Sequence, residues 1–207
     1  MPFVKRELPS SAQRDDARSD HMTSVETLGS PDSDQRWTAA RALGGHPGAV
    51  PALAAALKAE HVPRVREAIM TALVRVGDEA SVQTLLPYLR SSDAARRGAA
   101  IDALQSLPAA IAPFLAALLQ DTDSDVRILA IELVRGLPAP EATRLLCGLL
   151  ANETHPNVCA SAVDALAELG TPDALPVLQE WAVRFAKTPF LPFAISVAIA
   201  RISDAKS

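Results

Sequence analysis

One register of about 31 residues repeats along most of the chain, and no other feature of the sequence restricts the fold as much. The stretch QRWTAARAL begins the series, and VREAIMTAL, RRGAAIDAL, VRILAIELV and VCASAVDAL follow it 30, 31, 30 and 32 residues apart. The residues that anchor the register are Arg36, Arg66, Arg97, Arg127 and Cys159. Repetition at such a period is typical of stacked repeat architectures. The chain is therefore expected to fold as an array of similar units.

The apolar spacing inside each unit predicts two helices. Ala39 and Leu43 stand three and seven residues after the first anchor, and the later units keep this spacing. Such steps lie on one face of an α-helix. A second helix follows a turn, and its column of leucines is unbroken: Leu53, Leu85, Leu115, Leu146 and Leu178. A single helical hairpin cannot bury its apolar face alone, so the hairpins are expected to stack.

The combined pattern is D-x-x-V-R-x-x-A-x-x-A-L-x-x-x-G followed by A-x-x-x-L-x-x-x-L, and it resembles the short HEAT repeat of the phycobilisome-lyase type. The resemblance covers residues 31 to about 202 and implies an all-α, right-handed α-solenoid of HEAT-like helical hairpins. We expect five hairpins and a C-terminal half repeat within residues 31–207. Residues 20–30 are expected to form an N-terminal capping helix, and residues 1–19 a flexible arm.

The anchor arginines lie near helix starts, where a cation opposes the helix dipole and needs an anionic partner. Asp32, Asp93 and Asp123 precede first helices, so we expect them to cap these helices. Arg64 and Arg96 reinforce the series of arginines, and the nearest candidate anionic partners are these three aspartates with Asp34 and Asp125. Glu60 and Glu153 lie at unit junctions and are interpreted as solvated loop residues.

Two further expectations concern prolines and aromatic residues. Pro87 lies inside a second helix and predicts a kink there. Four aromatic residues near the C-terminus are expected to form one cluster around the last unit: Trp181, Phe185, Phe190 and Phe193.

Composition and motifs argue against several kinds of chemistry. Lys and Arg number 20 against 24 Asp and Glu, a balance that argues against a protein built to grip nucleic-acid phosphates. The two cysteines, Cys147 and Cys159, are interpreted as small buried hydrophobic residues. The four histidines lack metal-ligand spacing, and no apolar run is long enough to cross a bilayer. We expect a cytoplasmic protein without metal, cofactor, small-molecule or membrane partners.

The remaining expectation is a non-enzymatic scaffold or adaptor that binds a partner protein or peptide on the concave face formed by the second helices. The side chains assigned to this contact are Trp37, Tyr88, Arg90, Arg144, Glu180 and Arg184. Packing of Trp37 and Tyr88 against neighbouring hairpins is an equal possibility. Two other functions stay open: a bilin lyase-like chromophore-binding subunit, which the resemblance implies, and a HEAT-like nucleic-acid-binding protein or DNA glycosylase.

Overall fold

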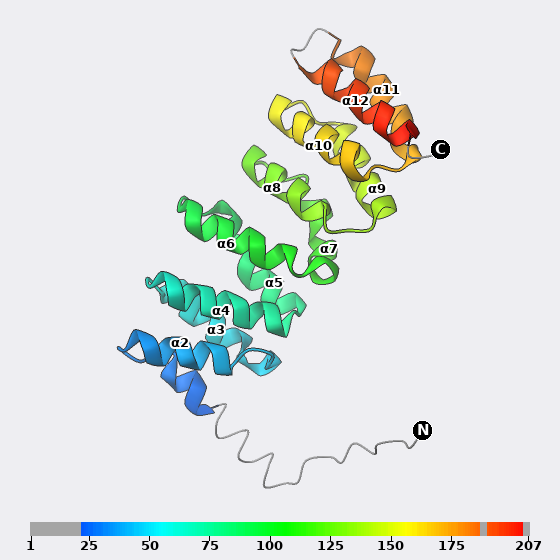
Figure 1. Cartoon of the computed structure of the whole chain (residues 1–207). Helices are drawn as coiled ribbons and strands as arrows, with labels where there is room; N and C mark the ends of the chain where they lie inside the picture. Colours follow the sequence, from blue (N-terminus) through cyan, green and yellow to red (C-terminus); the bar gives the residue numbers. More distant parts are fainter. Residues whose placement is uncertain (1–21, 187–189, 205–207) are drawn as a thin grey trace, which may run out of the picture. The chain divides into compact units, whose positions relative to one another are not determined.

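A computed structural model describes residues 22–186 and 190–204, and this part of the chain consists of helices joined by short turns (Figure 1). The first helices of the successive hairpins are α2 (Ser33–Ala42), α4 (Pro63–Val76), α6 (Ala94–Gln105), α8 (Ser124–Val134), α10 (Pro156–Leu169) and α12 (Leu191–Asp204). The second helices are α3 (Val50–Ala59), α5 (Glu79–Leu85), α7 (Pro108–Leu118), α9 (Ala139–Leu150) and α11 (Leu175–Arg184). Residues 22–27 are also helical, whereas the arm expected at 1–19 lies outside the described residues.

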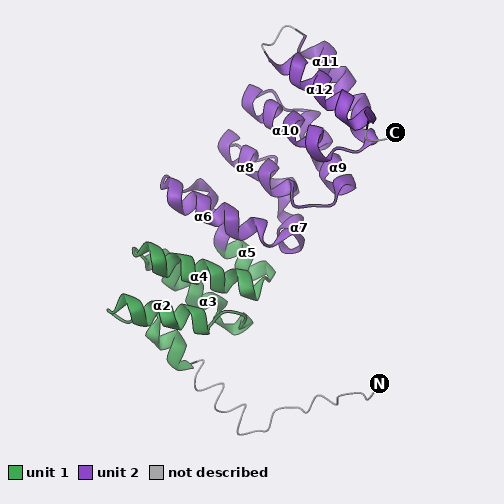
Figure 2. Ribbon diagram, in the orientation of Figure 1, with its two compact units in different colours: residues 1–84 green, residues 85–207 purple. Residues whose placement is uncertain are grey.

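The chain divides into two compact units, residues 1–84 and 85–207 (Figure 2). In the first unit α4 packs against both α2 and α3. In the second unit α8 packs against α6 and α10, and α10 packs against α12, while α7, α9 and α11 each pack beside these first helices. Consecutive hairpins thus stack on one another within a unit. The expected fold class, an all-α solenoid of HEAT-like hairpins, is confirmed.

The core follows the repeat columns. All five leucines of the unbroken second-helix column have no exposed surface. In the first helices the column that starts at Leu43 stays buried as far as Ala198 in α12. Each fully buried leucine contributes about 1.5–3 kcal/mol relative to an exposed one. A spacing of about 31 residues therefore places one apolar layer in every hairpin.

Pro87 changes the type of helix. The α-helix α5 ends at Leu85, and a 3₁₀-helix, η2 (Leu86–Arg90), continues the chain. Proline has no N–H to bond the carbonyl four residues earlier, so the α-helical ladder cannot continue through it. At the position where a kink was expected, the structure changes from α to 3₁₀ geometry.

The expected C-terminal aromatic cluster is wrong for two of its four members. Trp181 is buried and its ring centroid lies 4.6 Å from that of Phe185. Phe190 and Phe193 are 89% and 74% exposed. Because α12 turns Leu191 and Ile195 toward the core, Phe193 falls on the opposite side of the helix.

Gly170 ends α10 at a point where α12 packs closely against it, and its backbone is not in the left-handed conformation. Gly77 ends α4 in the left-handed conformation with φ 68°, whereas Gly170 has φ −64°. A Cβ on Gly170 would lie 2.4 Å from the carbonyl oxygen of Leu166 and 2.9 Å from Cδ1 of Ile202. The absence of a side chain therefore lets α12 pack closely on the end of α10.

We predict that Gly170→Ala destabilises the chain by about 1–3 kcal/mol, because the added methyl overpacks this contact. Gly98→Ala is the matched control, since Gly98 lies in α6 with no atom near its Cβ position. That substitution should stabilise by about 0.5–1 kcal/mol through helix propensity. Urea unfolding of both variants measures the difference, and equal effects would contradict the packing argument.

Candidate functional site

The same hydrogen bond occurs at the junction that precedes each of the helices α2, α4, α6, α8 and α10. The residue two positions before the N-cap accepts the backbone N–H of the N-cap residue through its side chain. The pairs are Ser30 with Asp32 (3.1 Å), Glu60 with Val62 (2.8 Å), Ser91 with Asp93 (3.2 Å), Asp121 with Asp123 (2.9 Å), and Glu153 with His155 (2.8 Å). This bond fixes the turn that starts each first helix.

The anchor arginines belong to the same junctions. Each donates from Nη1 to a backbone carbonyl just before its own helix. These bonds run from Arg36 to Ser30 (2.9 Å), Arg66 to His61 (3.2 Å), Arg97 to Ser91 (2.7 Å) and Arg127 to Asp121 (2.8 Å). The expected aspartates do cap three helices, since Asp32, Asp93 and Asp123 accept backbone N–H bonds. Among the described residues, no side chain of these three aspartates accepts a hydrogen bond from the guanidinium group of these four arginines. Other members of the expected series do pair, since Arg64 bonds Asp34 and Arg96 pairs with Asp93.

Two glutamates, and not the expected aspartates, form ion pairs with two of the anchor arginines. Glu60 accepts from Nε and Nη2 of Arg36 at 2.7 and 3.0 Å, and Glu153 accepts from Arg127 at 2.7 and 3.2 Å. Both glutamates are buried, so their interpretation as solvated loop residues is wrong. Both glutamates lie at junctions whose N-cap residue is not Asp. The N-cap residue is Val62 after Glu60 and His155 after Glu153.

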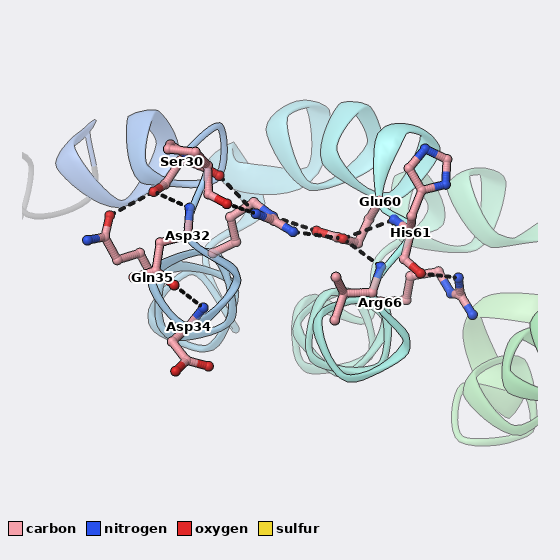
Figure 3. A network of polar contacts seen from close by, with 10 residues as sticks. Ser30, Asp32, Asp34, Gln35, Glu60, His61 and Arg66 are labelled. Atoms are coloured by element: carbon pink, nitrogen blue, oxygen red, sulfur yellow. Dashed lines mark hydrogen bonds and ion pairs between the residues drawn. The ribbon is translucent and has the colours of Figure 1, made fainter.

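Glu60 shows how one carboxylate serves two helices (Figure 3). Besides Arg36 of α2, it accepts the backbone N–H groups of His61 and Val62, which precede α4. The hydrogen bond from Arg36 and the two backbone N–H donors lower the pKa of Glu60 to about 2, against the opposing effect of burial. The charged pair therefore ties α2 to the start of α4.

This tie positions the side chains that follow it on both helices. Trp37 comes directly after Arg36 on α2, and Arg64 lies in the first turn of α4. The guanidinium carbons of Arg41 and Arg64 each lie 4.5 Å from the centroid of the Trp37 ring. Arg64 also bonds Asp34 at 3.0 Å. Stacking on Trp37 and pairing with Asp34 together hold Arg64 in place.

A surface groove of about 430 Å³ opens between α2 and α4, and we call it the Trp37 groove. Its lining consists of Trp37, Arg41, Arg64, Glu67, Ala68, Thr71, Ala72 and Arg75. The α4 residues recur at steps of three and four, so they form one helix face. From Arg64 to Arg75 this face runs for about 16 Å at 1.5 Å per residue.

The Trp37 groove is locally basic although the whole chain has a net charge of −4. Three arginines line it against one acid, Glu67. Within the described residues, neither Arg41 nor Arg75 has a carboxylate within 4.0 Å. Sequence reasoning selected Trp37 but missed Arg41 and Arg75. The spacing of Trp37 and Arg41 by four residues was the available signal, because it places them on one helix face.

A second groove lies in the other unit, between α7 and α9. Two adjoining hollows of about 370 and 170 Å³ share Leu119, Gln120, Gly148 and Leu149. Arg144 is exposed and lines the smaller hollow. This surface belongs to the second helices, as the sequence predicted for a binding face.

The other residues selected from the sequence do not gather at one place. Trp37 lies on the first helix α2 and not on a second helix. Tyr88 is half-buried in η2, and this burial raises the pKa of its phenol. Arg90 pairs with Asp121.

Glu180 and Arg184 are exposed on α11, where Arg184 lies 5.5 Å from the Trp181 ring centroid. Whether any residue of the set contacts a protein stays a prediction.

The two thiols lie in surroundings that favour their protonated form. Burial raises the pKa of the Cys147 thiol, and burial together with the charge of Glu153 raises that of Cys159 to about 11. In the described part of the chain, His, Cys, Asp and Glu form no group of three that is placed to hold a metal ion.

No single helix among the described residues has the length and apolar character to cross a membrane. The consecutive helices α6 and α7 meet those criteria only when taken together, and they are bent by 120°.

The model of HEAT repeats matches residues 24–105 and 111–184. The chain belongs to the HEAT-repeat family. Among solved structures, it resembles an archaeal HEAT-like repeats protein from Thermococcus onnurineus NA1, with a TM-score of 0.53, 16% identity and coverage of 97% of this chain and 100% of that one. It also resembles the complex of CpcE and CpcF of phycocyanin lyase from Nostoc sp. PCC7120, with a TM-score of 0.40, 18% identity and 98% coverage of both chains.

A curated relative, the bilin biosynthesis protein PecE of Nostoc sp., is 47% identical over 74 residues. The match covers 35% of this chain and 29% of PecE, so it spans less than a third of the relative's length. This match contradicts the expectation of a non-enzymatic scaffold or adaptor. It favours the alternative that the sequence left open, a bilin lyase-like subunit.

We predict that Glu60→Gln destabilises the chain by about 1–3 kcal/mol, because it removes the charge that Arg36 and the start of α4 share. Asp34→Asn is the matched control, since it breaks the exposed pair with Arg64 in the same unit. That change should cost about 0.5 kcal/mol or less. Thermal unfolding at pH 7 measures both, and equal losses would contradict the assigned role of Glu60.

The same charge predicts a pH dependence. The pKa of Glu60 is about 2 in the folded chain, below its ordinary value of 4.5. The ion pair therefore contributes its full stability above about pH 4.5 and loses it as the pH falls toward 2. Compared with Glu60→Gln, the wild-type chain should lose more stability across this window. Parallel profiles of the two proteins would contradict the lowered pKa.

Proposed function

We propose that this chain is a bilin lyase-like subunit that holds a bilin and delivers it to an acceptor protein. The observation that carries the proposal is the 47% identity with the bilin biosynthesis protein PecE over 74 residues. The proposal replaces the sequence-based expectation that the chain takes no small molecule. Its protein partner is the acceptor of the bilin.

The reaction in question is the addition of an acceptor cysteine to an exocyclic carbon–carbon double bond of the bilin. The sulfur–carbon bond forms as the π bond breaks, and the thiol proton ends on the adjacent carbon. Nothing is oxidised or reduced and no group leaves. A protein that holds the bilin and the acceptor in one orientation accelerates such an addition by reducing the entropy that it costs.

Two properties of the described residues support this role. The Trp37 groove combines an aromatic ring with unpaired arginines, which suits an extended, conjugated anion. Its volume of about 430 Å³ falls in the range of small-molecule sites. The thiols of Cys147 and Cys159 have raised pKa values, so they are protonated at neutral pH and are poor nucleophiles. The attacking sulfur is therefore assigned to the acceptor.

Titration of the purified full chain with biliverdin tests the first half of the proposal. We expect a saturable red shift and an induced circular dichroism signal in the visible region, because a bound bilin adopts one conformation. Heat-denatured chain at the same concentration is the control for non-specific uptake of pigment. A spectrum unchanged by folded protein would contradict the proposal.

We predict that Cys147→Ala combined with Cys159→Ala leaves bilin binding and bilin transfer unchanged. Both thiols are protonated at neutral pH, and alanine fits the fully buried site of Cys159. Transfer to apo-phycocyanin is measured as zinc-induced fluorescence of the acceptor band after denaturing electrophoresis. A covalent bilin on the wild-type chain that the double variant lacks would contradict the assignment of the nucleophile to the acceptor.

A further inference from the structure

Two arginines at one end of the Trp37 groove have charges that no carboxylate in the described residues balances. Arg41 lies in the last turn of α2 and Arg75 in the last turn of α4. Both are exposed and both line the groove. Two arginines that are also exposed, Arg64 and Arg90, are paired with Asp34 and Asp121. The groove thus presents two guanidinium groups with free donors.

Trp37 gives this pair a defined geometry. The guanidinium of Arg41 stacks on the indole ring at 4.5 Å from its centroid. Stacking uses the face of the guanidinium and leaves its N–H edges available, and those edges match a carboxylate in a two-pronged hydrogen bond. Arg64 stacks on the same ring, but Asp34 already accepts one of its donors. Arg41 and Arg75 are therefore the groups left to bind an anion.

We propose that the Trp37 groove is the bilin site of this chain, and that Arg41 and Arg75 bind the two propionate carboxylates of the pigment. This inference rests on the proposed function and adds the residues and the chemistry of recognition. The two propionates of a bilin are carried by its two central, neighbouring pyrrole rings, so they leave one edge of the pigment together. Two unpaired arginines at one end of the groove match this arrangement.

The single acid of the groove fits the same ligand. Glu67 lies on the α4 face between Arg64 and Arg75, one turn from Thr71. Pyrrole N–H groups of a bilin are hydrogen-bond donors, and a carboxylate is an acceptor for them. The groove therefore offers donors to the propionates and an acceptor to the pyrrole nitrogens. A ligand that carries only negative charges, such as a nucleic-acid backbone, is repelled by the carboxylate of Glu67.

The test compares biliverdin with its dimethyl ester on the full chain, by absorbance and induced circular dichroism. Wild-type protein should bind biliverdin about tenfold to a hundredfold more tightly than the ester, because esterification removes the charge that the arginines bind. The double variant Arg41→Gln, Arg75→Gln should lose this preference and bind both pigments about equally. Trp37→Leu keeps every charge but removes the ring on which Arg41 stacks, so it should weaken binding of biliverdin and reduce the preference for biliverdin over the ester.

The matched control is Lys58→Gln with Arg201→Gln, which removes the same charge from two exposed basic residues outside the groove. It should bind biliverdin as the wild type does. Equal weakening in both double variants would overturn the site, since a general charge effect would then explain binding. Wild-type affinity in the Arg41, Arg75 variant would also overturn the site while leaving the proposed function intact. Absence of biliverdin binding by folded wild-type chain would overturn the proposed function itself.

Discussion

The hydrogen bonds at the start of each first helix set the geometry on which the rest of the structure depends. The first N–H groups of a helix have no partner inside the helix, and five junctions of this chain satisfy one of them with a side chain two residues before the N-cap. An arginine one turn into the helix bonds a carbonyl of the same junction in four cases. A basic residue near a positive helix end is tolerable because carbonyl dipoles compensate its charge.

Much of the fold could be predicted because its information is local. A period of about 31 residues and steps of three, four and seven specify which side chains face inward, and the buried leucine column follows from them. The exposure of Phe193 could not be predicted from this spacing. Aromatic residues close in sequence suggest a cluster, but the helical phase set by Leu191 and Ile195 decides which of them reach the core.

The junction glutamates escaped prediction because their partners lie far along the chain. Glu60 follows Arg36 by 24 residues and Glu153 follows Arg127 by 26, so no helical spacing links the members of either pair. A weaker signal was present in the sequence. Both glutamates lie three residues before a proline that opens a helix, Pro63 or Pro156. Both also lie at junctions whose N-cap position lacks the aspartate found before α2, α6 and α8. The junctions that lack the aspartate of the repeat are therefore the junctions at which a glutamate compensates for it.

The Trp37 groove shows the same limit for the candidate site. Trp37 was selected as an aromatic residue suited to a protein contact, but its neighbours come from two helices whose contacting residues lie about 30 positions apart. Only the packing of α4 on α2 brings Arg64 to the indole ring and leaves Arg41 and Arg75 without carboxylate partners. The most direct measurement of the central claim is nuclear magnetic resonance of the Trp37 indole N–H and the arginine Nε–H groups during addition of biliverdin. The account predicts that the largest shifts fall on Trp37, Arg41 and Arg75. Shifts confined to the groove between α7 and α9, around Arg144, would contradict it.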